Sequence, residues 1–124
     1  MYRITLFIML FLLSLSLFSQ KGLKSKLYGK WQIESYEIFG EIHQPSLKER
    51  NDYILFKTNM FFEIFSEGNQ DKGSWSFNKE AKISLITDDN QSLEVTLLKI
   101  TSDFLTIKYN TKDLDYIIFH YKKQ

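Results

Sequence analysis

Hydrophobic and polar residues alternate with a period of two along most of the chain beyond residue 30, and turn-forming residues interrupt this alternation about every ten positions. The pattern predicts eight β-strands, over residues 30–39, 52–57, 60–66, 73–78, 82–87, 92–100, 105–109 and 114–122. The long connection between the first two contains the single proline, Pro45. One short helix is predicted over residues 21–28, where Leu23 and Leu27 lie four positions apart.

Short connections between consecutive strands favour an antiparallel, up-and-down sheet. A flat sheet of eight strands would leave two exposed edges, and closure into a barrel removes them. The expected fold is therefore all-β: an up-and-down antiparallel eight-stranded β-barrel, preceded by a short helical segment. A barrel of this size encloses either packed side chains or one small ligand.

Turn geometry predicts which residues face the interior in the first strands. Across a two-residue turn at Thr58-Asn59, Phe56 is expected to pair with Phe61. The inner face would then hold Ile54, Phe56, Phe61, Glu63 and Phe65, and Met60, Phe62, Ile64, Tyr53 and Leu55 would lie outside. If Trp31 points inward, alternation along its strand also places Ile33, Ser35 and Glu37 inside.

The same reasoning assigns faces in the later strands. A four-residue loop at 101–104 pairs Ile100 with Leu105, which places on one face Thr96, Leu98, Ile100, Leu105, Ile107 and Tyr109. Trp75 shares a face with Phe77, and Ile83 shares one with Leu85. In the last strand both faces are largely apolar, so its facing stays open. A slip of one residue would exchange the faces of any strand.

The first twenty residues are typical of a secretory signal peptide. Arg3 supplies a positive charge, residues 4–18 are almost all apolar, and Ser19 is a small residue before a polar stretch. This apolar run is shorter than the roughly 20 residues of a transmembrane helix. We therefore expect residues 1–20 to be a cleaved signal peptide and residues 21–124 one exported domain, periplasmic or secreted, without an integral membrane span.

The composition excludes several classes of function. Beyond residue 20 the chain carries 15 basic and 15 acidic side chains, so it lacks the positive surplus of nucleic-acid-binding proteins. It has no cysteine, which excludes disulfides and thiolate sites. The two histidines, His43 and His120, lie in distant segments, and no recognisable catalytic motif occurs. We expect no metal, no cofactor and no catalysis.

Several motifs resemble those of a known family. Gly29-Lys30-Trp31 begins the first strand, and a second glycine-x-tryptophan motif stands at residues 73–75. Residues 54–61 have the order strand, turn and aromatic strand, and residues 97–107 form a leucine- and lysine-containing hairpin. In these features the chain resembles bacterial lipocalin-like domains of the calycin type, and its leader, which ends in Phe-Ser-Gln, resembles those of exported Bacteroidetes proteins.

The resemblance implies that the barrel holds a small hydrophobic molecule or lipid without chemistry. An apolar interior desolvates such a ligand, and a few buried polar groups orient it. The candidate ligand contacts are Trp31, Ile33, Phe56, Phe61, Glu63, Trp75, Phe77, Leu98, Ile107 and Tyr109. The last-strand arginine that often packs on the first tryptophan of these barrels is absent, and the basic residues near that position are His120, Lys122 and Lys123.

Several candidates also have a purely structural interpretation. Trp31 and Trp75 can close one end of the barrel, and the phenylalanines can either fill the core or line a cavity. Glu63 can anchor a ligand, or it can lie in solvent if its strand is shifted by one residue, since burying an unpaired carboxylate is costly. The remaining polar candidates for the inner face are Ser35, Glu37 and Tyr109.

Two functions are consistent with these patterns. The first is an exported binding protein with a hydrophobic ligand in the barrel. The second is a packed barrel that serves as a structural or protein-interaction module in the cell envelope, with Met60, Phe62 and Ile64 as its partner surface. The interior volume separates them, because ligand pockets begin near about 300 Å³ and a smaller lumen favours the packed barrel.

Overall fold

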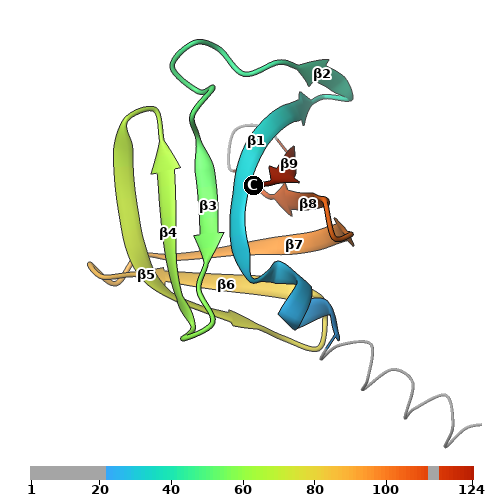
Figure 1. Ribbon diagram of the computed structural model, residues 1–124. Helices are drawn as coiled ribbons and strands as arrows, with labels where there is room; N and C mark the ends of the chain where they lie inside the picture. The colour runs from blue at the N-terminus through green and yellow to red at the C-terminus, as the bar shows by residue number, and fades with distance from the viewer. Residues whose placement is uncertain (1–21, 112–114) are drawn as a thin grey trace, which may run out of the picture.

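A computed structural model describes residues 22–111 and 115–124. These residues form one antiparallel sheet whose strands are β1 (Gly29–Ile38), β2 (Glu41–His43), β3 (Tyr53–Phe56), β4 (Phe61–Ser66), β5 (Asn69–Phe77), β6 (Lys82–Thr87), β7 (Ser92–Ile100), β8 (Phe104–Tyr109) and β9 (Ile117–Lys123). Strand β1 pairs with both β3 and β9, so β1 and β3–β9 close into an eight-stranded barrel (Figure 1). The predicted fold is confirmed.

Several strand boundaries differ from the prediction, and the last strand begins at Ile117, three residues after its predicted start. Residues 67–72, expected to be a polar loop, belong largely to β5, because Glu67 and Gly68 both take positive φ (49° and 88°) and make a two-residue hairpin turn. The long connection after β1 contains β2, which pairs with the end of β1. Both segments are polar because they extend past the core into solvent, where alternation no longer reports burial.

A short helix over residues 22–27 covers the lower end of the barrel in Figure 1. Leu27 is fully buried, and Leu23 packs against the same core. The indole N–H of Trp31 donates to the Leu27 carbonyl at 2.8 Å, and the ring of Tyr28 meets that of Trp75 edge-on at 5.9 Å. The predicted pair of leucines therefore plugs one end of the barrel, together with both tryptophans.

The turn between β3 and β4 corrects the predicted register. It has three residues, 58–60, instead of two: the Lys57 N–H donates to the Phe61 carbonyl at 2.9 Å, and Met60, not Asn59, has the positive φ, of 70°. Phe56 consequently pairs with Phe62 rather than with Phe61. Because successive side chains alternate, this shift of one residue turns every side chain of β4 to the opposite face.

Two irregularities in the ladder have the same effect elsewhere. Between β7 and β8, Ile100 pairs with Leu105 as predicted, but Leu98 is an extra residue in a bulge, so Leu97 turns inward in its place. Between β1 and β9 the register shifts between Ile33 and Ser35. Beyond that point Tyr36, rather than Ser35 or Glu37, faces inward.

The seam between β1 and β9 closes the barrel and settles the facing of the last strand. Phe119 and Tyr121 face the interior. Lys123 lies with its ammonium group 4.5 Å from the centre of the Trp31 ring, and it donates a hydrogen bond to the Tyr28 carbonyl. Among the three basic residues near the position of the family's arginine, Lys123 is therefore the one that packs on the first tryptophan.

Candidate ligand-binding cavity

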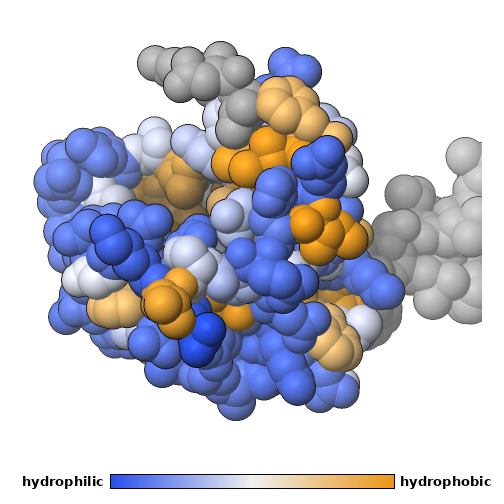
Figure 2. All heavy atoms as spheres, turned by 90° about the horizontal axis from the view of Figure 1, so that it is seen from above, coloured by the Kyte–Doolittle hydropathy of each residue, from blue (hydrophilic) through white to orange (hydrophobic). Residues whose placement is uncertain are grey.

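The end of the barrel opposite the helix opens into a cavity of about 270 Å³. Its wall is mainly apolar and aromatic, and the lining residues are Ile33, Tyr36, Glu49, Asp52, Tyr53, Ile54, Ile64, Phe65, Ser66, Leu85, Leu93, Val95, Ile107, Tyr109, Phe119 and Tyr121. Viewed from above, hydrophobic residues lie at the bottom of a recess that hydrophilic residues surround (Figure 2). The arrangement can desolvate a small apolar molecule and leave one end of it near polar groups.

Two carboxylates stand at this cavity. Glu49 belongs to the turn before β3, where the Ser46 N–H donates to Glu49 Oε1 at 3.0 Å and the Glu49 N–H donates to Ser46 Oγ at 3.3 Å. The first of these bonds is the largest cause that lowers the pKa of Glu49. Asp52 directly precedes β3 and accepts a bond from the Glu67 N–H at 2.9 Å. Burial, followed by the charges of Glu49 and Glu67, raises the pKa of Asp52 against the effect of that bond.

Aromatic rings with hydroxyl groups form one side of the cavity. The Tyr36 hydroxyl donates to Glu49 at 3.5 Å, and Phe119 lies between Tyr36 and Tyr121, with ring centres 6.4 and 6.2 Å away. Burial, with a smaller contribution from the charge of Asp52, raises the pKa of Tyr121 well above its usual value. Tyr121 is therefore neutral at physiological pH and offers a hydroxyl rather than a charge.

Seven of the ten predicted contact residues lie in the barrel interior, in two groups. Ile33, Ile107 and Tyr109 line the cavity. The others pack in the core toward the closed end and do not line the cavity: Trp31, Phe56, Trp75 and Phe77. Trp31 and Trp75 therefore lie where the structural interpretation places them, at the closed end of the barrel.

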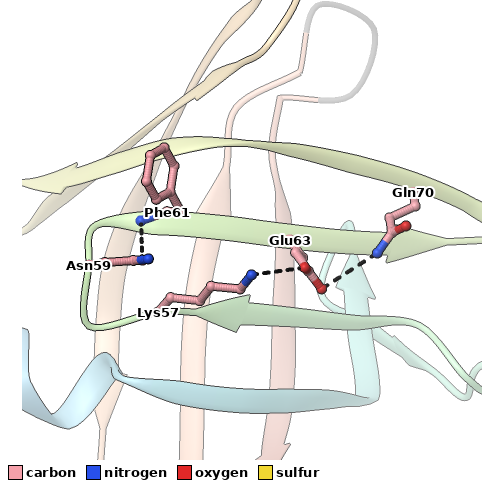
Figure 3. Close-up of polar contacts among 5 residues, drawn as sticks. All are labelled: Lys57, Asn59, Phe61, Glu63 and Gln70. Carbon is pink, nitrogen blue, oxygen red and sulfur yellow. Dashed lines mark hydrogen bonds and ion pairs between the residues drawn. The ribbon is translucent and has the colours of Figure 1, made fainter.

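The other three predicted contacts, Phe61, Glu63 and Leu98, lie on the outer surface. Phe61 and Glu63 follow the corrected register of β4, and Leu98 follows the bulge in β7. Glu63 forms an ion pair with Lys57, with 3.0 Å between Lys57 Nζ and Glu63 Oε1. It also accepts a hydrogen bond from the side-chain amide of Gln70 at 3.5 Å (Figure 3). The interpretation of Glu63 as an outer residue on a shifted strand is thus the correct one.

The remaining polar predictions separate in the same way. Tyr109 lines the cavity, whereas Ser35 lines an outer groove and Glu37 contacts His120. His120 lies 3.3 Å from Glu37 and 3.1 Å from the Thr106 hydroxyl, and these contacts join β1, β8 and β9 on the outside of the barrel.

The other histidine, His43, stacks on Tyr36, with ring centres 5.4 Å apart. Within the described part of the chain, no three acidic, histidine or cysteine side chains gather as metal ligands.

The comparisons with known proteins agree with this geometry. The family model described as a lipocalin-like domain matches residues 27–119. The chain belongs to the lipocalin-like domain family. Such domains are generally binding proteins rather than enzymes, and their barrels suit small hydrophobic ligands. A search of the curated proteins finds no match. In residues 22–111 and 115–124 of this lipocalin-like domain, no helix has both the length and the apolar character of a membrane span.

Sequence reasoning missed part of the cavity of this lipocalin-like domain. Ile64 was assigned to the outside, although Phe62 and Ile64 are together more apolar than Phe61 and Glu63, and that contrast favours the observed register. For Glu49, the signal is its spacing from Ser46, since a serine followed three positions later by glutamate forms a reciprocal capping box. Nothing local marks Asp52 as a cavity residue, because the folding of the loop brings it there.

Proposed function

We propose that this lipocalin-like domain binds one small, mainly apolar molecule in the cavity. The observation that carries the proposal is the asymmetry of the barrel. One end is sealed by the helix and the tryptophans, and the other opens into an apolar chamber. A barrel that served only as a packed scaffold would gain nothing from this chamber, because unfilled apolar space forfeits packing contacts.

The cavity volume limits the size of the ligand. At about 270 Å³ it is slightly below the roughly 300 Å³ at which ligand pockets begin. Taken alone, this volume favours the packed barrel by a narrow margin. An apolar cavity of about 150 Å³ nevertheless accommodates benzene. The ligand that we propose is accordingly a molecule with a single ring or a short chain, not a long-chain lipid.

The structure removes part of the basis for the packed-barrel alternative. Its proposed partner surface was Met60, Phe62 and Ile64, but Phe62 is buried and Ile64 lines the cavity. The exposed apolar residues of that region are instead Phe61 and Ile86, at 53% and 47% exposure. Ser74 of β5 pairs with both, so the two side chains flank one position of the sheet.

A pair of matched substitutions in β7 tests binding in the cavity. Leu93 lines the cavity, and Leu98 lies on the outer face of the same strand. We expect Leu93→Phe to lower the affinity of a fluorescent apolar dye about tenfold, because the added ring occupies space that the dye needs. Leu98→Phe should leave the dye affinity within about twofold of the original protein.

The outcome separates the two functions. If the dye does not bind, or binds equally well to both variants, cavity binding is contradicted and the packed barrel becomes the better account. Native mass spectrometry of the protein expressed with its leader gives an independent measurement. Under the proposal, a fraction of the molecules carries an additional mass that Leu93→Phe reduces.

We further propose that the protein acts after export. The support is the charged, apolar and small-residue order of residues 1–20, which lie outside the described residues. We expect the chain isolated from the periplasm or medium to begin at Gln20 or Lys21, as measured by intact mass. Replacing Leu12 and Leu13 by arginine should leave the chain uncleaved inside the cell, and recovery of the intact leader on an exported protein would contradict the proposal.

A further inference from the structure

The charged side chains that line the cavity are both acidic. Glu49 and Asp52 line it, and among the described lining residues there is no lysine, arginine or histidine. Glu67 adds a third negative charge close enough to affect Asp52. The other titratable groups that line the cavity are Tyr36, Tyr53, Tyr109 and Tyr121, and His43 stacks on Tyr36.

The two cavity carboxylates differ in how far the protein satisfies them. Glu49 accepts bonds from the Ser46 N–H and from the Tyr36 hydroxyl. Asp52 accepts the Glu67 N–H at Oδ1, and no basic side chain forms an ion pair with it in the described part of the chain. A carboxylate can accept about four hydrogen bonds, so both groups keep free acceptor positions. A charged donor in the cavity would satisfy them.

The apolar wall also favours a cation over an anion. Tyr36, Phe119 and Tyr121 line the cavity, and aromatic rings attract ammonium groups. The Tyr121 hydroxyl makes no hydrogen bond to another described residue, so it is available to a ligand. A carboxylate-ended ligand would meet two like charges in partly desolvated surroundings, where repulsion is strong.

Together these contacts define a ligand class. On the basis of the proposed function, we propose that the ligand is a small amphiphilic amine whose apolar body fills the chamber and whose ammonium group lies between Glu49 and Asp52. The volume of about 270 Å³ sets its size at one ring with a short side chain. Fatty acids and other apolar anions are excluded by charge.

Three probes with the same phenyl body and different head groups test the inference on the purified protein. We expect calorimetry at pH 7 to show 2-phenylethylamine binding about tenfold more tightly than 2-phenylethanol, because a charge-assisted bond is worth about that factor. The anion 3-phenylpropionate should bind most weakly. Asp52→Asn should lower the amine-to-alcohol affinity ratio about threefold or more, and cooperative urea unfolding of the variant shows that it is folded.

The matched control is Glu94→Gln. Glu94 is exposed on the outer surface, where it pairs with Lys82 at 3.3 Å, so this change removes a negative charge away from the cavity. The amine-to-alcohol ratio should not change in that variant. Equal binding of amine and alcohol, tighter binding of the acid, or a ratio that Asp52→Asn leaves unaltered overturns the inference.

The failure of this inference can be told apart from failure of the proposed function. If none of the three probes binds, the amine class is rejected, and the dye displacement with Leu93→Phe and Leu98→Phe decides whether the cavity binds any apolar ligand. If the dye binds and the amine preference is absent, the binding function stands and only the head-group assignment falls.

Discussion

Asp52 is held where its charge opposes folding. Burial and two neighbouring carboxylates raise its pKa, so the folded protein keeps a proton on this group at a pH where the unfolded chain has lost it. As pH rises above the unfolded-state value of about 3.9, the folded state is penalised relative to the unfolded one. A residue that reduces stability at neutral pH and lines a cavity is typical of binding sites, where function and stability compete.

This assignment leads to a prediction for stability as a function of pH. Asparagine can still accept the Glu67 N–H bond, so Asp52→Asn removes the charge and keeps the contact. We expect its free energy of unfolding at pH 7 to equal or exceed that of the original protein, and the difference to disappear as pH falls toward 4. Urea unfolding across this range measures it. A variant that is less stable at pH 7, by an amount that grows with pH, would show that the charge stabilises the fold.

Lys123 packs on Trp31, in the place where similar barrels often have an arginine. Its ammonium group contacts the Trp31 ring and bonds to the Tyr28 carbonyl, and burial lowers its pKa. A β-carbon at Gly29 would overlap the end of this side chain, and Gly29 also has a φ of +122°. The backbone conformation therefore accounts for the glycine of the first motif, whereas the end of the lysine side chain could move aside.

Within the strands, irregular positions determine which residues reach the cavity. A bulge at Leu98 brings Leu97 and Val95 inward, and a register shift after Ile33 brings Tyr36 inward. Each inserts one residue, and therefore reverses the alternation beyond it. Tyr36, which bonds to Glu49, owes its place in the cavity to such a shift.

The second glycine-x-tryptophan motif gives a prediction about the packing of β5. A β-carbon on Gly73 would overlap the carbonyl of Ile86 in the adjacent strand β6, and backbone atoms cannot move aside. We expect Gly73→Ala to lower the free energy of unfolding by about 3 kcal/mol, the upper part of the usual range for overpacking.

Gly22→Ala is the matched control for this prediction. Nothing lies within 4 Å of a β-carbon at Gly22, which is the first described residue of the helix. Its effect should be below about 1 kcal/mol, because only helix propensity changes. Denaturant unfolding of both variants checks the pair, and equal effects at the two glycines would contradict the role given to the β5–β6 approach.

At the scale of the whole molecule, closure and plugging divide the barrel into two functional halves. The helix, both tryptophans and Phe56 fill the lower half, and the rings of Phe56 and Trp75 lie 4.9 Å apart there. The upper half keeps an open chamber beside two carboxylates. Under the proposed function the ligand lies in the upper half, and four of the residues that line it also belong to the core: Ile54, Leu85, Val95 and Ile107.

The predicted contact residues follow that division. Ile107 and Tyr109 were assigned to the correct face because Ile100 does pair with Leu105 and β8 itself is regular. Phe61, Glu63 and Leu98 were assigned wrongly because a turn length and a bulge lie between them and the residues from which their faces were counted. In β4 the alternation gives only a weak signal, because both faces contain phenylalanine and only Glu63 marks the outer one.

Alternation and turn residues are properties of neighbouring positions, and they were sufficient for the strand order, the barrel and the pair of leucines that plug it. The face to which each side chain points is not such a property, because it depends on where a single extra residue is inserted in a strand or turn relative to the partner strand. The carboxylates of Glu49 and Asp52 meet the chamber only because the loop after β2 folds over the open end. Such long-range placement, which local pattern does not encode, decided the volume of the chamber and the sign of its charge.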